Sequence, residues 1–294
     1  MKPTVLIVGD RRKKGVSEGV AEHLPLLRGM LDVQAVDLAG ETDLSTARAD
    51  LVLVFGGDGS IRHVARRLGT NPIPVLGVNY GKFGFLTAVE PEHLESGIRR
   101  WIDGESALSQ RHRMLVRFLC DGKEVSRTLA FNDVVVGRKA IGGMVDVDVG
   151  INGRRAVTYA GDGLIVATST GSTAHALAAG GPLIEPTADV VLLVPIAPHT
   201  LSARPLVVPV AHSIQLSISG RRRPGGVTID GLKPVSLKKR DVVDISDAKA
   251  PLTLVYPEGR SFYDALRRKL GWRGRPHYVG DEEHWEEDPE PSSP

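Results

Sequence analysis

The sequence has one cysteine, few aromatic residues and no long apolar run. Cys120 is the only cysteine among 294 residues, which excludes an internal disulfide and a cysteine-cluster metal site and is typical of a reducing compartment. Such a residue is expected to be small and buried. No apolar run approaches the roughly 20 residues that span a bilayer, and MKPTVLIVGDRRKK returns to charge too soon for a signal peptide. We therefore expect a cytoplasmic protein with no membrane partner.

Basic residues are spread along the chain, and acidic residues gather at its end. The formal net charge is +2, yet residues 280–294 contain seven acidic residues and no lysine or arginine. We expect this segment to be a disordered acidic tail, and the rest of the chain is basic enough to favour an anionic partner. The sequence has no long basic run and only 5% aromatic residues. It therefore favours a phosphate-bearing small molecule and no nucleic acid.

Residues 1–103 predict an α/β domain with a parallel sheet. Short apolar runs, as in PTVLIVG, DVQAVDL, DLVLVFGG and IPVLGVN, alternate with helical patterns. Pro25 is expected to break or kink the first helix.

Residues 104–257 predict a β-rich domain. Strands with alternating apolar residues meet at Asp121-Gly122 and Asn152-Gly153, which are typical hairpin turns. The stretch SFYDALRRKLGW, within residues 258–272, predicts a closing helix with Ser261 as its N-cap.

Asp58 stands among Gly56, Gly57 and Gly59 at the end of the apolar run LVLVF. Glycine lets a ligand approach the main chain, so such a turn can direct N–H groups at a phosphate. A carboxylate and a phosphate repel each other. The carboxylate therefore indicates a residue that accepts a proton or binds a metal ion. The alternative is that Asp-Gly is simply favourable turn chemistry. The motif is neither a Walker A loop nor a complete G-x-G-x-x-G fingerprint.

Two further polar stretches are candidates for a binding site. Residues 158–186, TYAGDGLIVATSTGSTAHALAAGGPLIEP, are dense in hydroxyl groups and glycine, as a nucleotide or sugar pocket requires. They are equally compatible with a polar connection that caps a short helix. Asn132 and Asp133 begin another apolar run, and such a pair alone is typical of a turn.

Seven stretches resemble, in order, the NAD kinase family, which phosphorylates NAD to NADP: GGDGS, GVNYGKFGFLT, FNDVVV, GDGLIVATSTGSTAHALAAGGP, PIAPHTLSARPLVVP, IDG and FYDALRRKLGW. The resemblance covers nearly all of the chain except the acidic tail. Diacylglycerol kinases, sphingosine kinases and phosphofructokinases share the first motif, whereas the long fourth stretch is much more specific. The resemblance implies an N-terminal Rossmann-like domain, an all-β C-terminal domain and a last helix that returns to the first domain. It also implies NAD between the domains, in homodimers or homotetramers.

The same resemblance implies roles for individual residues. Asp58 is expected to take the proton from the adenosine ribose 2′-hydroxyl of NAD as that hydroxyl attacks the terminal phosphate of ATP. Mg²⁺, or another divalent cation, is expected to be held mainly through the substrate phosphates, with no metal-ligand set in the protein. Phe85 is expected to pack on the dinucleotide. The residues implied to bind NAD or the phosphate donor are Gly56, Gly57, Gly59, Ser60, His63, Phe85, Asn132, Asp133, Asp162, Thr170, Thr173, Ala174, His175, Ala178 and Ala197.

Some of these positions depart from the family pattern. Asp133 stands where glutamate is common and is one methylene shorter. His175 replaces tyrosine, so binding is expected to depend on pH near neutrality. Ser60 replaces threonine and keeps the hydroxyl. His63, where a basic residue is common, either faces phosphate or is solvated, and the basic loop DRRKK at residues 10–14 either attracts the donor or is solvated.

Two other functions stay open. A lipid kinase would share the glycine-aspartate motif, but the sequence has no amphipathic basic helix or aromatic-rich insertion. A non-catalytic dinucleotide-binding protein would explain the departures at Asp133 and His175, but it has no need of the carboxylate at Asp58. ATP and inorganic polyphosphate both stay open as the donor.

Overall fold

The described residues of the computed structural model are 2–81, 84–138, 144–219, 225–257 and 261–271. They form three six-stranded sheets. The elements are β1 (Thr4–Gly9), α1 (Val16–Met30), β2 (Asp32–Asp37), β3 (Leu51–Gly56), α2 (Asp58–Leu68), β4 (Val75–Asn79), η1 (Pro91–His93), α3 (Leu94–Ile102), β5 (Ala107–Arg111), β6 (Met114–Cys120), β7 (Lys123–Ala130), β8 (Asp133–Arg138), β9 (Val145–Ile151), β10 (Arg154–Gly161), β11 (Gly163–Thr168), η2 (Thr170–Thr173), α4 (His175–Ala178), β12 (Val190–Ile196), β13 (Leu206–Pro209), β14 (Ile214–Ser219), β15 (Gly225–Ile229), β16 (Val235–Leu237), β17 (Asp241–Asp247), β18 (Leu252–Tyr256) and α5 (Phe262–Leu270). The expected acidic tail, residues 280–294, lies outside the described residues.

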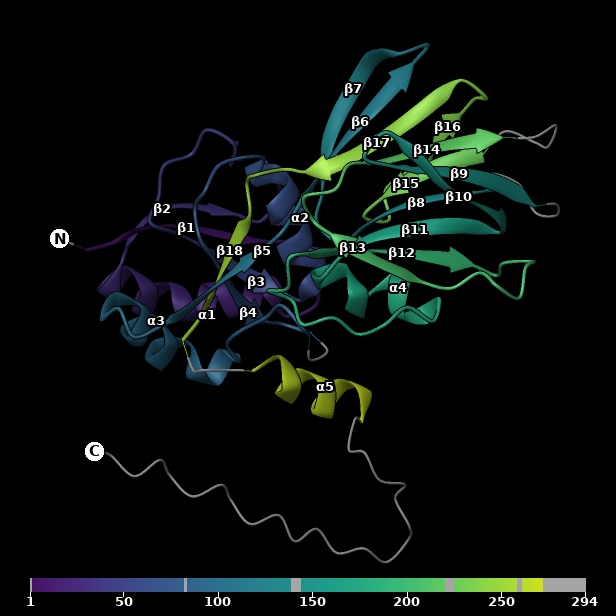
Figure 1. Ribbon diagram of the computed structural model, residues 1–294. Helices are drawn as coiled ribbons and strands as arrows, with labels where there is room; N and C mark the ends of the chain where they lie inside the picture. The colour runs from purple at the N-terminus through teal and green to yellow at the C-terminus, as the bar shows by residue number, and fades with distance from the viewer. Residues whose placement is uncertain (1, 82–83, 139–143, 220–224, 258–260, 272–294) are drawn as a thin grey trace, which may run out of the picture.

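The first sheet has the strand order β2-β1-β3-β4-β18-β5 (Figure 1). Its first five strands are parallel and β5 runs antiparallel to β18, which confirms the α/β fold expected for the first part of the chain. Two of these strands lie within residues 104–257, the range expected to form the second domain. The chain leaves the first sheet after β5 and returns through β18. Alternation of apolar residues does not reveal which sheet a strand joins, so the sequence could not show this return.

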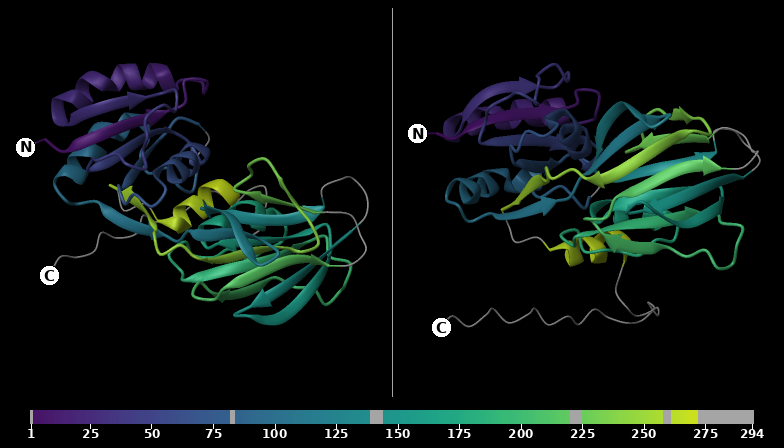
Figure 2. Two further views of the ribbon diagram at one scale, coloured as in Figure 1. Left: turned by 90° about the horizontal axis from the view of Figure 1, so that it is seen from above. Right: turned by 45° about the horizontal axis from the view of Figure 1, so that its top comes forward.

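The other two sheets pack face to face as a sandwich (Figure 2), with the strand orders β10-β9-β14-β17-β6-β7 and β13-β12-β11-β8-β15-β16. Alternate residues point inward, so that Val145, Val147 and Val149 of β9 share one core with residues of β8 and β11. The hairpins turn where the sequence predicts, at Asp121-Gly122 and Asn152-Gly153. All four turn residues have positive φ angles, between 46° and 78°, as this type of turn requires. The β-rich C-terminal region is thereby confirmed.

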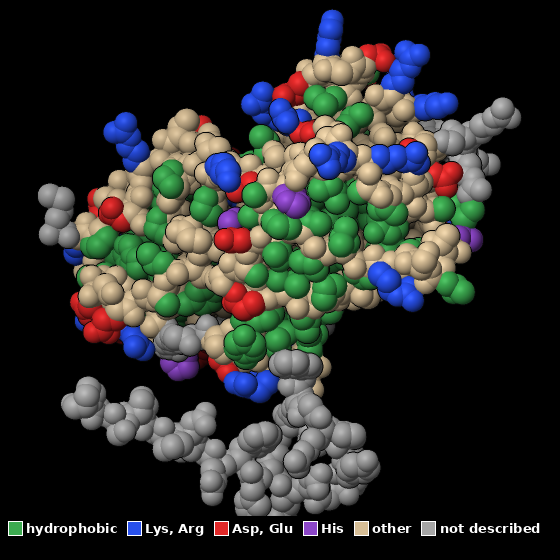
Figure 3. Space-filling model, viewed as in Figure 1, with side chains coloured by type: hydrophobic (Ala, Val, Ile, Leu, Met, Phe, Trp, Pro, Cys, Tyr) green, Lys and Arg blue, Asp and Glu red, His purple; other side chains and the backbone are tan. Residues whose placement is uncertain are grey.

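Apolar side chains are exposed on one face of the sandwich, near the edge strand β13 (Figure 3). Leu201 is 93% exposed, and Leu206 and Val207 are exposed on β13 itself. Contiguous apolar surface on a folded protein often marks a contact with another molecule. Among the described residues, no helix is long and apolar enough to cross a membrane.

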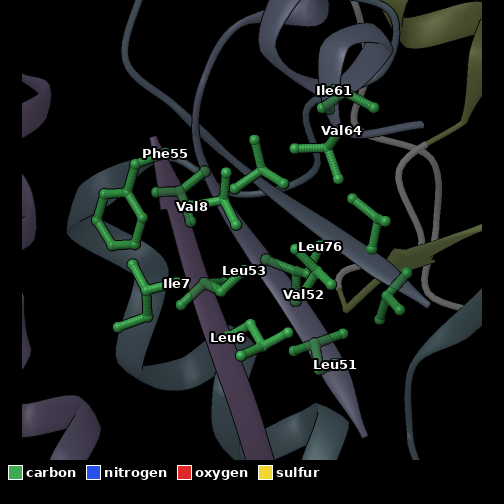
Figure 4. Close-up of a cluster of buried hydrophobic side chains, with 14 of the residues drawn as sticks. Leu6, Ile7, Val8, Leu51, Val52, Leu53, Phe55, Ile61, Val64 and Leu76 are labelled. Atoms are coloured by element: carbon green, nitrogen blue, oxygen red, sulfur yellow. The ribbon is translucent and has the colours of Figure 1, made fainter. Parts of the chain in front are cut away.

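The core of the first sheet explains why β3 is an unbroken apolar run. Every residue of β3 is buried, because helices cover both faces of the sheet. From α2, Ile61 and Val64 pack beside the side chains of β3 and β4 (Figure 4). Burial of each such side chain stabilises the fold by about 1.5–3 kcal/mol. This packing holds the first turn of α2, and therefore Asp58, at the carboxyl end of β3.

Arg113 ties the other end of α2 to the connections between the two domains. Its guanidinium donates hydrogen bonds to the carbonyl oxygens of Ala65 at 3.2 Å, Gly69 at 2.5 Å and Ala250 at 2.6 Å. Burial lowers the pKa of Arg113 to about 10, so the group stays charged at neutral pH. A cation at this position is favoured by the carboxyl end of a helix.

Two local expectations differ from the structure. Of the break or kink expected at Pro25, no break occurs, because helix α1 runs through this residue. Pro25 and Ala21 are both exposed, so water can satisfy the carbonyl that the proline leaves without a donor. Cys120 is exposed, because it ends β6 directly before a hairpin turn.

Candidate active site

Asp58 lies in the first turn of α2, and its carboxylate is held by the main chain that follows β4. Oδ2 accepts a hydrogen bond from the N–H of Phe85 at 2.9 Å, and Oδ1 accepts one from the N–H of Leu86 at 3.0 Å. The helix N-terminus also favours a negative charge here. The side chain is still 30% exposed. The carboxylate is therefore fixed in position and open on one side.

Gly84 makes this arrangement possible. A Cβ atom at residue 84 would lie 2.0 Å from Oδ1 of Asp58, so any larger residue here would displace the carboxylate. Neither Gly84 nor Leu86 was among the predicted site residues. The stretch GVNYGKFGFLT contains both, but the sequence does not show that this loop returns to Asp58.

A basic cavity of about 560 Å³ lies beside the glycine-aspartate motif. Gly59, Ser60 and His63 of α2 line one side of it, and the loop at residues 10–14 contributes Lys13 and two arginines to the other. Lys13 Nζ donates a hydrogen bond to Ser60 Oγ at 2.7 Å. The structure thus brings the basic loop and the glycine-aspartate motif together, and a cavity of this charge suits a polyphosphate.

His63 is less suited than Lys13 to act as a cation. Its Nδ1 lies 3.0 Å from a guanidinium nitrogen of Arg66. Partial burial and the positive charges of Arg66 and Arg67 lower the pKa of His63. The neutral imidazole is therefore favoured near pH 7.

A second group of predicted residues meets at the end of β8 in the sandwich. The carboxylate of Asp230 accepts hydrogen bonds from the N–H groups of Phe131 at 2.8 Å, Asn132 at 2.7 Å and Asp133 at 3.1 Å. Gly171, directly after Thr170, approaches so closely that a Cβ would lie 2.1 Å from the carbonyl oxygen of Asn132. Asp230 was not predicted as a site residue, although the IDG motif contains it. The predicted residues in this group are Asn132, Asp133, Thr170, Thr173, Ala174, His175 and Ala178.

Two members of this group bury polar atoms that have no hydrogen-bond partner among the described residues. Asn132 Oδ1 and Thr170 Oγ1 are buried, and neither makes a hydrogen bond to any of the residues that the structure describes. A buried polar atom without a partner costs about 1–3 kcal/mol. Such atoms are typical of sites where a ligand supplies the missing hydrogen bond.

Asp133 is a buried carboxyl group with an altered acidity. Burial, and then the negative charge of Asp230, raise the pKa of Asp133 to about 6, and the positive charges of His175 and Arg62 reduce the shift. Arg62 belongs to α2, so this interaction joins the sandwich to the helix that begins with Asp58.

Asp162 and Ala197 lie away from this group. Asp162 precedes β11 and forms an ion pair with Arg138 at 3.0 Å, and its N–H donates to the carbonyl oxygen of Ile196 at 3.0 Å, directly before Ala197. Thr170 follows the opposite end of β11. A strand rises roughly 3.3 Å per residue, so about the length of β11 separates the two groups.

These features define a two-domain phosphotransferase: an α/β sheet with a glycine-rich turn and a fixed carboxylate, a basic cavity beside that turn, and a β-sandwich with unpaired polar atoms.

The family model of the ATP-NAD kinase N-terminal domain matches residues 37–106, and the family model of the ATP-NAD kinase C-terminal domain matches residues 131–256. The NAD kinase of Thiobacillus denitrificans is 37% identical over 281 residues, which cover 92% of this chain and 97% of the relative. The NAD kinase of Burkholderia multivorans is 35% identical, with 92% and 93% covered. The chain therefore belongs to the NAD kinase family.

Solved structures agree with this fold. Yeast NADH kinase complexed with NADH superposes with a TM-score of 0.85 at 22% identity, covering 94% of this chain and 89% of the yeast chain. An NAD kinase from Archaeoglobus fulgidus in complex with ATP superposes with a TM-score of 0.72 at 25% identity, covering 91% and 97%.

Proposed function

We propose that the chain transfers the terminal phosphoryl group of ATP to the 2′-hydroxyl of the adenosine ribose of NAD and so forms NADP. The observation that carries the proposal is the Asp58 carboxylate, which is fixed by two main-chain N–H groups and partly exposed. The next two residues of the chain, Gly59 and Ser60, line a basic cavity. The named ligands of the two solved relatives, NADH and ATP, support a dinucleotide acceptor and a nucleotide donor.

Asp58 acts as the general base in this proposal. It accepts the proton of the 2′-hydroxyl while the ribose oxygen forms a bond to the terminal phosphorus. The bond from that phosphorus to its bridging oxygen breaks, and the electron pair leaves with ADP. Positioning and charge stabilisation supply most of the rate in such a transfer, so a carboxylate held in place is suited to the role.

The basic cavity holds the phosphate donor. Lys13 and Arg62 supply positive charge, Ser60 supplies a hydroxyl, and phosphates can approach the main chain of Gly59. The same features suit inorganic polyphosphate, which we keep as an alternative donor.

A divalent cation fits the donor site only together with phosphate. Among the described residues, no cluster of three or more His, Cys, Asp or Glu side chains could hold a metal ion. Asp10 lines the cavity and is paired with Arg12 at 2.9 Å. Mg²⁺, held mainly by donor phosphates and water, would neutralise phosphate charge.

The sandwich binds the dinucleotide. Asn132 Oδ1 and Thr170 Oγ1 form hydrogen bonds to it, and Phe85 packs against it. Thr173, Ala174, His175 and Ala178 line the same part of the site. Asp162 and Ala197, at the other end of β11, contact the far end of an extended dinucleotide.

Self-association is part of the proposal. The exposed apolar side chains near β13 support a homodimer or homotetramer in the cytoplasm. Light scattering of the purified chain measures the number of subunits, and a monomer at micromolar concentration would contradict the proposal.

The test is NADP formation from NAD, ATP and Mg²⁺ by the purified chain, with polyphosphate replacing ATP in a parallel reaction. Product with either donor supports the kinase and identifies the donor. Measurable NAD binding without product would favour a non-catalytic dinucleotide-binding protein. Absence of both product and NAD binding would favour a lipid kinase.

A further inference from the structure

One face of helix α5 lies toward the turn that carries Asp58. A capping box between Ser261 and Asp264 fixes the first turn of the helix. Phe262 and Lys269 are seven residues apart, which is two turns, so they lie on the same face. In the left view of Figure 2, α5 lies at the junction between the first sheet and the sandwich.

Both of these side chains contact Phe85. The ring of Phe262 lies 6.1 Å from that of Phe85, and Lys269 Nζ lies 4.5 Å from the Phe85 ring centroid, within the range of a cation–π interaction. Lys269 Nζ also lies 3.5 Å from Oδ2 of Asp58. The last helix therefore places an ammonium group beside the carboxylate of the first domain.

This ammonium group is not needed to hold Asp58 in place. The two main-chain N–H groups already bind both carboxylate oxygens at 2.9 and 3.0 Å, and the lysine contact is longer. The Lys269 side chain is 37% exposed, and its Nζ makes no other hydrogen bond to the described part of the chain. Its three donors are mounted on a flexible stem, so they are available to a ligand.

Lys269 Nζ is close enough to Asp58 to contact the phosphoryl group that is transferred to the ribose hydroxyl. A base must lie within about 2.6–3.2 Å of the hydroxyl oxygen that it deprotonates, and the attacked phosphorus lies about 3–3.5 Å beyond that oxygen. An ammonium group 3.5 Å from the same carboxylate can therefore reach the oxygens of the transferred phosphoryl group by a rotation of its side chain.

We propose that Lys269 is a catalytic residue, whose ammonium group contacts the oxygens of the phosphoryl group during its transfer. Lys13, bound to Ser60 in the cavity, serves the donor side, and Lys269 serves the acceptor side next to Asp58. Lys269 moves no proton: the hydroxyl proton passes to Asp58, the ribose oxygen gains the bond to phosphorus, and ADP leaves with the electron pair. Lys269 stabilises the negative charge of the transition state. This inference rests on the proposed NAD kinase activity.

The experiment compares Lys269→Ala, Lys269→Gln and Lys269→Arg with the unmodified chain, using kcat and the KM values for NAD and ATP. Removal of one such charge-stabilising donor lowers kcat by about 10²–10³-fold, and we expect this loss in Lys269→Ala and Lys269→Gln, with KM for NAD changed less than about 3-fold. Lys269→Arg should retain more activity. Arg267→Ala is the matched control, because Arg267 lies on the same helix and pairs with Asp264; its kcat should equal that of the unmodified chain.

Rescue by small amines separates a catalytic role from a structural one. Methylammonium or ethylammonium, added at constant ionic strength, should restore part of the kcat of Lys269→Ala in a saturable way, and tetramethylammonium, which has no N–H donor, should not. A kcat for Lys269→Ala and Lys269→Gln equal to that of the unmodified chain would overturn the inference alone. Loss of activity that no amine restores would also overturn it. An unmodified chain that forms no NADP would overturn the proposed function, and this inference with it.

Discussion

The α/β domain and the sandwich hold their polar site residues in opposite ways. Asp58 has hydrogen-bond donors on both carboxylate oxygens, so its position is set before any ligand binds. Asn132 and Thr170 instead bury oxygen atoms without a partner among the described residues. A group whose hydrogen-bond partners are in place is already positioned to react. A buried unpaired atom instead contributes binding free energy when a ligand supplies its missing hydrogen bond. The comparison supports the proposed roles, in which Asp58 reacts and Asn132 and Thr170 recognise the ligand.

The largest expected effect tests the reacting side of this comparison. Asp58→Asn keeps the size of the side chain and removes its basicity, so kcat should fall by about 10²–10⁴-fold while NAD still binds. Steady-state kinetics measure kcat, and calorimetry measures NAD binding. A variant with near-full kcat would remove Asp58 from the role of base.

A smaller loss is expected when the support of Asp58 is changed. In Gly84→Ala the new methyl group would displace the carboxylate, and a displacement of about 1 Å can cost roughly 10²-fold in rate. Gly81→Ala, in the same loop, is the matched control and should keep its kcat, because no described atom lies within 4 Å of its Cβ position. Equal rates for the two variants would show that the loop does not position Asp58.

The raised pKa of Asp133 tests whether a site residue of the sandwich lowers the stability of the fold. Because burial raises the pKa of Asp133 from 3.8 to about 6, the folded state binds the proton more tightly than the unfolded state. Its charge therefore destabilises the fold above pH 6, by about 2–3 kcal/mol, and the penalty disappears as the pH falls below about 4. Urea denaturation should find Asp133→Asn more stable than the unmodified chain at pH 8, with no difference below pH 4.

Asp50 provides the contrast for that measurement. Hydrogen bonds from Thr4 lower the pKa of Asp50, so its charge contributes stability above the pKa of the unfolded state. Asp50→Asn should therefore destabilise the fold at pH 8. Equal pH trends for the Asp50 and Asp133 variants would contradict the assignment of opposite shifts.

The smallest expected effect tests the recognising side. Asn132→Ala removes one hydrogen-bond acceptor, which should raise KM for NAD by about 10-fold, or about 1.4 kcal/mol, with little change in kcat. A fall in kcat with unchanged KM would instead place Asn132 among the reacting groups, and the comparison between the two domains would fail.

Much of the fold could be predicted because its signals are local. Apolar runs, hairpin turns and the Ser261 cap each depend on a few adjacent residues. The return of β18 to the first sheet could not be predicted, because alternation marks a strand and not its neighbour. The same limit applies to the site. The glycine-aspartate turn was visible, but Leu86, Gly84 and Lys269 reach Asp58 only through tertiary structure.

The most direct test of the central claim is the position of the phosphate in the product. Phosphorus NMR of the product formed from NAD, ATP and Mg²⁺ identifies the hydroxyl that was phosphorylated. The account predicts a single new monoester, coupled to the proton on carbon 2′ of the adenosine ribose. A phosphate on any other hydroxyl, or no new monoester from a chain that binds both substrates, would contradict it.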